Sequence, residues 1–165
     1  MTAEEHQVCL LLGSNIQPEK NIVEGVNLLR ARATLVCSSS VWETPSEGAA
    51  GPNFLNLSLL ITTPLPADEL KETILRPIEA QLGRVRSADK NAPRPIDLDI
   101  VFFDGHLLDP TLWLYAHRAV PVAEIFPEVR SDQGLLLKNV AAQLAKTNPI
   151  RLRADVRIDH RLHAG

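Results

Sequence analysis

The sequence has few cysteines and no long apolar run. Its 165 residues include two cysteines, and no segment approaches the ~20 apolar residues of a membrane-spanning helix. Cys9 and Cys37 both lie in apolar, strand-like runs. This predicts buried thiols in a reducing compartment, not a disulfide framework or a zinc site. The acidic start, MTAEEHQ, contains no apolar run, so we expect no signal peptide, no membrane partner and a cytoplasmic location.

Aromatic residues and positive charge are also scarce. Phe, Trp and Tyr make up 4% of the chain, and the net charge is −3. RNA-binding domains usually carry aromatic-rich strand motifs and a basic surface, and the sequence has neither. We therefore expect no nucleic-acid partner. Internal repeats and low-complexity segments are absent as well.

The order of the expected elements predicts the fold class. A chain of 165 residues, 45% hydrophobic and 22% charged, suits one soluble domain over residues 1–165. The apolar patterns predict strands at 8–12, 34–43, 54–63 and 96–103, and helices from Pro18 and from Pro66 to Gly83. This order is that of an α+β, ferredoxin-like βαββαβ sandwich. The C-terminal additions would be a short strand at 112–115, a helix at 135–145, and either an edge strand or a disordered tail at 150–158.

The strand expected at 96–103 carries two carboxylates on one face. Because alternate residues of a strand share a face, the two sets are Ile96, Leu98, Ile100 and Phe102, and Asp97, Asp99, Val101 and Phe103. Asp97 and Asp99 would lie ~7 Å apart. Burying two like charges is unfavourable without a cation, and Mg²⁺ prefers one or two carboxylates together with substrate phosphates. The alternative is a solvated strand face without metal.

A basic segment precedes these carboxylates. Arg84, Arg86, Lys90 and Arg94 lie in a stretch without apolar periodicity. Such a stretch cannot build a packed core, so we expect a mobile loop over 84–94 that orders when ligands bind. Together with the acidic pair, it predicts a site for a metal-bridged polyphosphate; otherwise it is only a hydrated loop.

Two other segments bear on ligand binding. Phe54 and Asn56 share the polar face of the strand at 54–63, and this pair suits a flat heterocycle that stacks on the ring and is read by the amide. An edge aromatic beside a solvated amide is the alternative. In the second helix, Pro77 predicts a kink or a bulge. Glu79 either orients Arg84 or Arg86, or faces water.

Several ordered motifs resemble those of one enzyme family. RPIDLDI at 94–100, preceded by GRVR at 83–86, resembles the signature of the 6-hydroxymethyl-7,8-dihydropterin pyrophosphokinases. LGSN at 12–15, ETP at 43–45 and FLN at 54–56 resemble further segments of that family. The resemblance covers roughly Val8 to Pro127, most of the chain.

The resemblance implies a reaction and a set of site residues. Pyrophosphate would pass from ATP to 6-hydroxymethyl-7,8-dihydropterin, with release of AMP, in folate biosynthesis. The resemblance also fits a monomer and two Mg²⁺ ions at Asp97 and Asp99. Arg84 and Arg94 would join this pair as catalytic residues. The pterin would contact Thr44, Pro45, Phe54 and Asn56, and ATP would contact Glu79, Arg84, Arg86, Arg94, Ile100 and His117.

The sequence departs from the family pattern in three places. Only three residues separate His117 from Pro121, where the family usually has a segment with a second stacking aromatic and another arginine. Asn91 stands where the family often has Trp, and Phe54 replaces a common Tyr. The short segment after His117 leaves open a pterin- or nucleotide-binding relative without turnover. A ferredoxin-like RNA-binding module is the second rival class, and the scarce aromatics and the negative net charge argue against it. A structural role for His117 is a further alternative.

Overall fold

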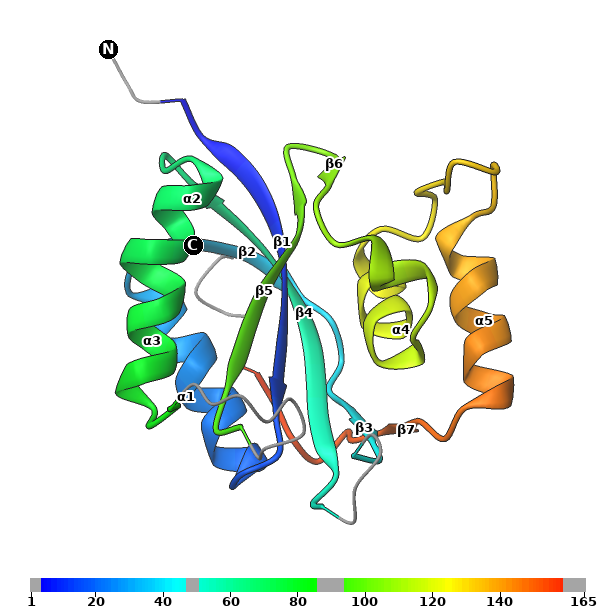
Figure 1. Cartoon of the computed structure of the whole chain (residues 1–165), viewed down its shortest axis with the longest axis horizontal. Coiled ribbons are helices and arrows are strands. Elements are labelled where there is room, and N and C mark those ends of the chain that lie inside the picture. Colours follow the sequence, from blue (N-terminus) through cyan, green and yellow to red (C-terminus); the bar gives the residue numbers. More distant parts are fainter. Residues whose placement is uncertain (1–3, 47–50, 86–93, 159–165) are drawn as a thin grey trace.

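The computed structural model describes residues 4–46, 51–85 and 94–158 (Figure 1). The elements, in chain order, are β1 (His6–Ser14), α1 (Pro18–Arg30), β2 (Thr34–Ser38), β3 (Trp42–Thr44), β4 (Phe54–Thr63), α2 (Ala67–Leu70), the π-helix η1 (Lys71–Leu75), α3 (Arg76–Gln81), β5 (Asp97–Phe103), β6 (His106–Leu107), the 3₁₀ helix η2 (Pro110–Trp113), α4 (Ala116–Ile125), α5 (Leu137–Thr147) and β7 (Arg151–Leu152). No helix within these ranges has both the length and the apolar character needed to span a membrane.

The strands form one antiparallel sheet between two helical layers. Its order is β6-β5-β1-β4-β3-β7, and β2 also pairs with β4. The helices α1, α2 and α3 cover one face, and α4 and α5 lie on the other (Figure 1). The predicted α+β, ferredoxin-like fold with C-terminal additions is therefore confirmed.

The face under α1, α2 and α3 holds the larger apolar core. Every second residue of β4 points into this core, and the four are at most 1% exposed: Leu55, Leu57, Leu59 and Ile61. Burying one such side chain contributes about 1.5–3 kcal/mol. The period of two in the sequence thus predicted both the bounds and the buried face of β4.

A bulge changes the predicted faces of β5. Cys9 of β1 pairs with Phe102, but Leu10 pairs with Ile100, so Val101 is an extra residue. The bulge reverses the alternation beyond it. Phe102 packs on the α4 side with Val101, and Phe103 packs against the larger core. The sequence prediction was correct for Asp97, Asp99 and Val101 and wrong for the two phenylalanines.

The second helix contains the bulge that its proline predicts. Pro77 has no N–H to donate to the carbonyl of Thr73, and Thr73 lies in the π-helical turn Lys71–Leu75 just before it. Gly83 follows the helix with φ +96°, a conformation that favours glycine. The bulge and the helix end are both confirmed.

Other local predictions need correction. The strand expected at 34–43 is interrupted at 39–41, where the Ser39 hydroxyl accepts a hydrogen bond from the Ser58 N–H in place of a regular ladder contact. The prediction of a strand at 112–115 is wrong. The segment begins instead with a 3₁₀ helix that starts at Pro110 and is capped by the Asp109 side chain. The helix expected at 135–145 starts and ends two residues later. Of the edge strand expected at 150–158, only Arg151–Leu152 forms a strand, β7, which pairs with β3.

Candidate active site

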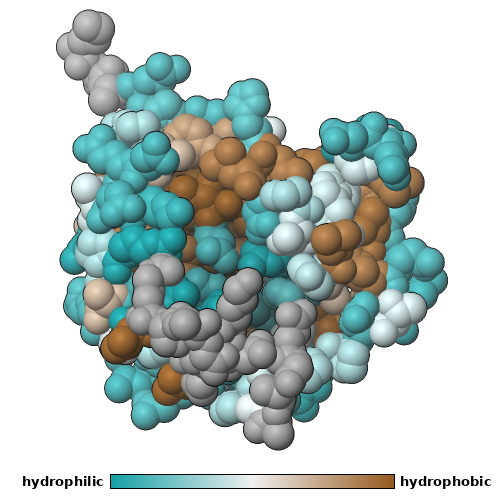
Figure 2. Space-filling model, viewed as in Figure 1, coloured by the Kyte–Doolittle hydropathy of each residue, from teal (hydrophilic) through white to brown (hydrophobic). Residues whose placement is uncertain are grey.

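A cavity of about 240 Å³ lies between the sheet and α4. Its walls come from β1, β3, β4, β5, η2 and α4. On the side of the molecule shown in Figure 2, hydrophilic surface in the centre borders hydrophobic surface above it. The predicted site residues that line this cavity are Thr44, Pro45, Phe54, Asn56, Arg94, Asp97, Asp99 and His117. The fold therefore brings together residues that are up to 73 positions apart in the chain.

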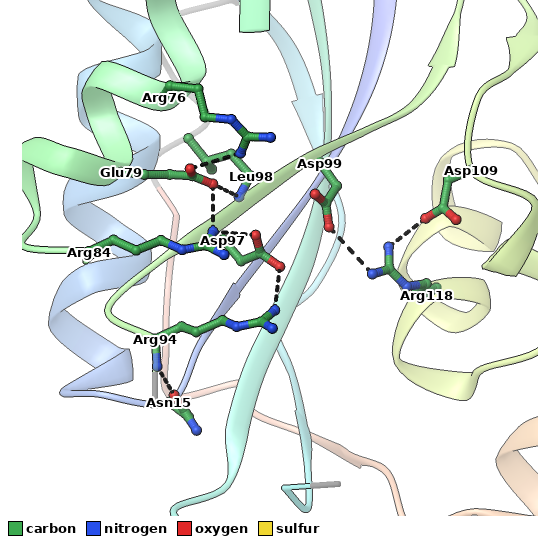
Figure 3. Close-up of polar contacts among 10 residues, drawn as sticks. All are labelled: Asn15, Arg76, Glu79, Arg84, Arg94, Asp97, Leu98, Asp99, Asp109 and Arg118. Carbon is green, nitrogen blue, oxygen red and sulfur yellow. Dashed lines mark hydrogen bonds and ion pairs between the residues drawn. The ribbon is translucent and has the colours of Figure 1, made fainter. Parts of the chain in front are cut away.

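Asp97 is held by two arginines. The Arg84 Nη1 atom lies 2.6 Å from Asp97 Oδ1, and the Arg94 Nη1 atom lies 3.1 Å from Oδ2 (Figure 3). Both guanidiniums come from the two ends of the basic segment predicted to bind phosphate. In this arrangement they neutralise the carboxylate, as charge-assisted hydrogen bonds do.

Glu79 fixes Arg84 from behind. Its side chain is almost completely buried, and it accepts hydrogen bonds from Arg76, Arg84 and the Leu98 N–H, each at 2.9 Å (Figure 3). A buried carboxylate is stable when donors surround it in this way. Of the alternatives left open by the sequence, the structure selects the orientation of Arg84 and excludes a water-facing Glu79.

Asp99 has a weaker partner. Its Oδ2 atom lies 3.4 Å from Arg118 Nη2, while Arg118 Nη1 lies 2.6 Å from Asp109 (Figure 3). Burial, followed by the charge of Asp97, raises the pKa of the Asp99 carboxyl above its ordinary value. This carboxylate is therefore poised to accept another cation.

Sequence reasoning did not assign a role to Arg118 or Asp109. Arg118 reaches Asp99 because it lies in the first turn of α4. Pro121 interrupts the apolar pattern of that helix, so no helical face could be predicted there. The one available signal was the position of Arg118 directly after His117.

The LGSN segment anchors the end of the basic loop. The Arg94 N–H donates to Asn15 Oδ1 at 2.6 Å, and the Asn15 N–H donates to the Arg94 carbonyl at 3.0 Å. Asn15 is 2% exposed, so the contact is protected from water. It fixes the backbone of Arg94 beside Asp97, a role that the resemblance of LGSN did not specify.

The pocket predicted for a heterocycle has a flat ring and an oriented amide. The Asn56 Nδ2 atom donates to Thr44 Oγ1 at 3.0 Å and to the Trp42 carbonyl at 3.3 Å. Gly13 has no side chain, and a Cβ there would lie 3.4 Å from Asn56 Oδ1 and 3.8 Å from the Phe54 ring. The glycine therefore leaves the amide oxygen and the ring accessible from the cavity.

His117 is half-buried in the cavity wall. Its ring is stacked on Tyr115, with centroids 5.4 Å apart and an interplanar angle of 21°. Burial, and secondarily the charge of Arg118, lowers the pKa of His117 to about 4. The imidazole is therefore neutral at physiological pH, and its contact with a nucleotide stays a prediction.

Of the predicted ATP contacts, Ile100 does not line the cavity, and Arg86 is not described. The Ile100 side chain packs against the larger core, on the face of β5 opposite Asp99, so its contact with ATP also stays a prediction. Arg86 lies outside the described residues, as do Lys90, Asn91 and most of the loop expected to close over the ligands.

The carboxylates fit a metal that is completed by substrate. Within residues 4–46, 51–85 and 94–158, no three His, Cys, Asp or Glu side chains converge on one metal position. Asp97 and Asp99 supply two hard oxygen ligands, which suits Mg²⁺ shared with phosphates and does not suit a closed structural metal site.

The comparisons with known proteins agree with this geometry. The family described as 7,8-dihydro-6-hydroxymethylpterin-pyrophosphokinase (HPPK) matches residues 9–127. The curated 2-amino-4-hydroxy-6-hydroxymethyldihydropteridine pyrophosphokinase of Methylorubrum extorquens is 35% identical over 130 residues, which cover 72% of this chain and 81% of that protein. The protein of the same name from Pseudomonas aeruginosa is 32% identical over 149 residues, which cover 82% and 90%.

Other relatives are much longer. The folate synthesis bifunctional protein of Arabidopsis thaliana is 30% identical over 122 residues, and the chain spans a quarter of its length (72% of this chain, 25% of that protein). A crystal structure of Plasmodium falciparum HPPK-DHPS superposes with a TM-score of 0.66 at 10% identity, covering 87% of this chain and 46% of that one. Because its sequence identity is so low, this structural match supports the fold alone. From the family match and the two bacterial relatives, the chain belongs to the 7,8-dihydro-6-hydroxymethylpterin-pyrophosphokinase family.

Proposed function

We propose that this protein transfers pyrophosphate from ATP to 6-hydroxymethyl-7,8-dihydropterin in folate biosynthesis and releases AMP. The observation that carries the proposal is one cavity in which Phe54 and Asn56 lie beside Asp97 and Asp99. A flat-ring pocket next to paired carboxylates suits a heterocyclic alcohol that meets a metal-bound triphosphate. The family membership of the chain supports the same reaction.

Asp97 and Asp99 would hold two Mg²⁺ ions together with the ATP phosphates. When bound, Mg²⁺ neutralises phosphate charge and orients the reacting groups. Asp99 suits this role because its contact with Arg118 is long and its pKa is raised. Arg84 and Arg94 would then exchange a carboxylate partner for phosphate oxygens.

The arginines would supply most of the remaining stabilisation. Arg84 is oriented by Glu79, and Arg94 is fixed through its backbone by Asn15. Preorganised charge of this kind stabilises a transferring phosphoryl group without rearrangement during the reaction. Arg118 adds a third cation beside Asp99, and Arg86 is proposed as a further phosphate contact. Glu79 therefore acts on ATP through Arg84, while the backbone near Ile100 is proposed as a nucleotide contact.

The pterin alcohol would bind on the other side of the carboxylates. Phe54 would stack on the ring, Asn56 would read its polar edge, and Thr44 and Pro45 would complete the wall. The hydroxymethyl oxygen would then attack the β-phosphorus, and the bond from that phosphorus to the α-phosphate bridge would break to give AMP. In the same proposal the chain is a single domain over residues 1–165 and acts as a cytoplasmic monomer.

The products test this proposal directly. Purified protein with MgATP and reduced hydroxymethylpterin should form AMP and pterin diphosphate in equal amounts. Formation of ADP would mean γ-phosphoryl transfer. Binding of both ligands without any product would favour the relative that has lost turnover.

A further inference from the structure

The short strand β3 holds the amide that we propose to bind the pterin. Thr44 Oγ1 and the Trp42 carbonyl, both in β3, accept hydrogen bonds from the Asn56 Nδ2 atom at 3.0 and 3.3 Å. The strand has only three residues, Trp42–Thr44, and so short a strand needs further contacts to keep its position. The direction of the Asn56 amide oxygen therefore depends on the contacts that fix β3.

The C-terminal segment supplies such contacts at the edge of the sheet. β7 pairs with β3 on the side away from β4 (Figure 1), and the Arg153 N–H donates to the Val41 carbonyl at 2.9 Å. Beyond β7, Val156 and Ile158 pack against the larger core. This segment lies after residue 127, where the family match ends, so the resemblance assigns it no role.

Glu43 joins β3 to the C-terminal segment through its carboxylate. Because alternate residues of a strand share a face, Glu43 points away from the cavity that Thr44 lines. Its Oε1 atom lies 2.6 Å from Arg153 Nη1 and 2.9 Å from Arg151 Nη2, and its Oε2 atom accepts from Asn53 at 2.7 Å. These hydrogen bonds, that of Asn53 first, lower the pKa of Glu43 to about 2. The carboxylate is therefore ionised, and it ties β3 both to the residue before β4 and to the C-terminal segment.

Arg153 reaches more of the molecule than Arg151 does. Its side chain is 16% exposed, against 71% for Arg151, and it also contacts Glu19 of α1 at 3.1 Å and Asp155 at 2.9 Å. An exposed ion pair contributes little to stability, whereas a shielded guanidinium that bonds several carboxylates is fixed in direction. Arg153 therefore joins β3 to the first turn of α1, while Arg151 contacts the same carboxylate from the solvent side.

We propose that Arg153 is a positioning residue for the pterin: through Glu43 it fixes β3, and so holds Thr44 and the Asn56 amide in their binding arrangement. The inference rests on the proposed function, and it places Arg153 in contact with neither substrate. Loss of the Arg153 side chain should leave β7 in place, because the pairing of β7 with β3 is made by the backbone. It should let β3 shift relative to β4, and pterin binding should then weaken.

Titration calorimetry measures the two ligands separately. A non-hydrolysable α,β-methylene analogue of MgATP is titrated into the protein, and reduced hydroxymethylpterin is titrated into protein saturated with that analogue. We expect Arg153→Ala to raise the pterin Kd by about 3- to 10-fold, the scale of one weakened hydrogen bond. The analogue Kd should not change, because β5, which carries the proposed metal ligands, is separated from β3 by β1 and β4. Arg151→Ala is the matched control and should keep the wild-type pterin Kd.

A second variant reaches the same contact from β3. Glu43→Gln keeps the size of the side chain and removes its charge, so it should raise the pterin Kd by a similar factor. The double variant Arg153→Ala/Glu43→Gln should show no more than the larger single loss, because effects of residues that act through one contact do not add. Thermal unfolding shows which variants are folded, and Glu43→Gln decides the inference if Arg153→Ala does not fold.

Each result decides the inference. Wild-type pterin affinity in Arg153→Ala, equal losses in Arg151→Ala and Arg153→Ala, or losses that add in the double variant would overturn it. Weaker binding of both ligands by one factor, together with a lower melting temperature, would also overturn it, because Arg153 would then serve stability alone. In each of these cases the proposed function stands, whereas a wild-type protein that binds no pterin would overturn both.

Discussion

The two faces of the sheet differ in how completely their charged groups are paired. Under α1, α2 and α3 the core is apolar, and Glu79 at its edge is 2% exposed with three hydrogen-bond donors around it. Under α4, Asp97 and Asp99 line a cavity, and two of their arginine partners, Arg94 and Arg118, are themselves partly exposed. The carboxylate on the first face keeps its hydrogen-bond donors, whereas the ion pairs on the second face can be exchanged for contacts with a ligand.

This difference separates residues that hold the fold from residues that we propose to act on ligands. A partly exposed ion pair contributes little to stability, so an arginine can leave a carboxylate for a phosphate at small cost. Removing a donor from a buried carboxylate is far more unfavourable. Substitutions on the cavity side should therefore change turnover or binding, and substitutions on the apolar side should change stability.

The largest effect is expected at the paired carboxylates. Asp97→Ala or Asp99→Ala should lower turnover at limiting Mg²⁺ by about 10³ or more, because each removes a hard oxygen ligand from the proposed metal site. Circular dichroism should show an intact fold. The exposed Asp132→Ala is the control and should keep wild-type rates. Wild-type rates in either cavity variant would remove the metal assignment.

The next effect is expected at Arg94. Arg94→Ala should lower turnover by about 10²–10³, the scale of one lost preorganised donor. Its backbone contact with Asn15 does not need the side chain, so stability should change little. Steady-state rates are compared with those of Arg130→Ala, a substitution of an exposed arginine outside the cavity. Similar rates in the two variants would contradict the role of Arg94.

A substitution on the apolar face of the sheet should lower the stability of the protein and leave ligand binding unchanged. Leu57 is fully buried on the helix-covered side of β4. Leu57→Ala should lower the free energy of unfolding by about 3 kcal/mol, because it leaves a cavity in a close-packed core. Urea unfolding measures this loss. An unchanged midpoint would show that the face is less tightly packed than the structure indicates.

Phe54, three residues before Leu57 in β4, faces the cavity and tests the other face of the strand. Phe54→Ala should weaken pterin binding by about 1–3 kcal/mol, the scale of one lost stack, with little change in ATP affinity. Calorimetry with each ligand separates the two. Equal losses for both ligands would make Phe54 a packing residue, and the contrast between the faces of β4 would fail.

The smallest effect concerns the charge of Asp99 itself. Because the folded-state pKa of Asp99 is raised above its unfolded value, the folded protein loses stability as the pH rises from the unfolded pKa through the raised pKa, and the loss is complete above it. Asp99→Asn should therefore raise the melting temperature slightly at near-neutral pH. Below the ordinary carboxyl range, where both states of the wild type are protonated, the two proteins should melt together. A difference of the same size at both pH values would contradict this cause.

The sequence predicted elements best where local patterns act alone. The alternation of β4, the proline at the start of α1 and the glycine after α3 each specify their structure without distant partners. The RPIDLDI segment also located the carboxylate pair correctly on one strand face, because its two residues lie before the bulge in β5.

What sequence reasoning missed depends on contacts between distant segments. The bulge at Val101 arises from the pairing of β5 with β1, and no local pattern in the sequence of β5 predicts it. For Glu79 the sequence left two alternatives open, and the choice between them depends on the fold, which encloses the carboxylate with Arg84 and the Leu98 N–H. Arg118 was missed because Pro121, inside α4, prevented the prediction of a helix there from the apolar pattern.

The most direct measurement follows the β-phosphorus of ATP. Wild-type protein and Asp97→Asn are incubated with reduced hydroxymethylpterin, Mg²⁺ and ATP that is isotopically labelled at the β-phosphate. The account predicts that the label leaves the nucleotide with the wild type, appears in the pterin product and leaves unlabelled AMP, while Asp97→Asn transfers almost none. Label that remains in ADP, or equal transfer by the two proteins, would contradict it.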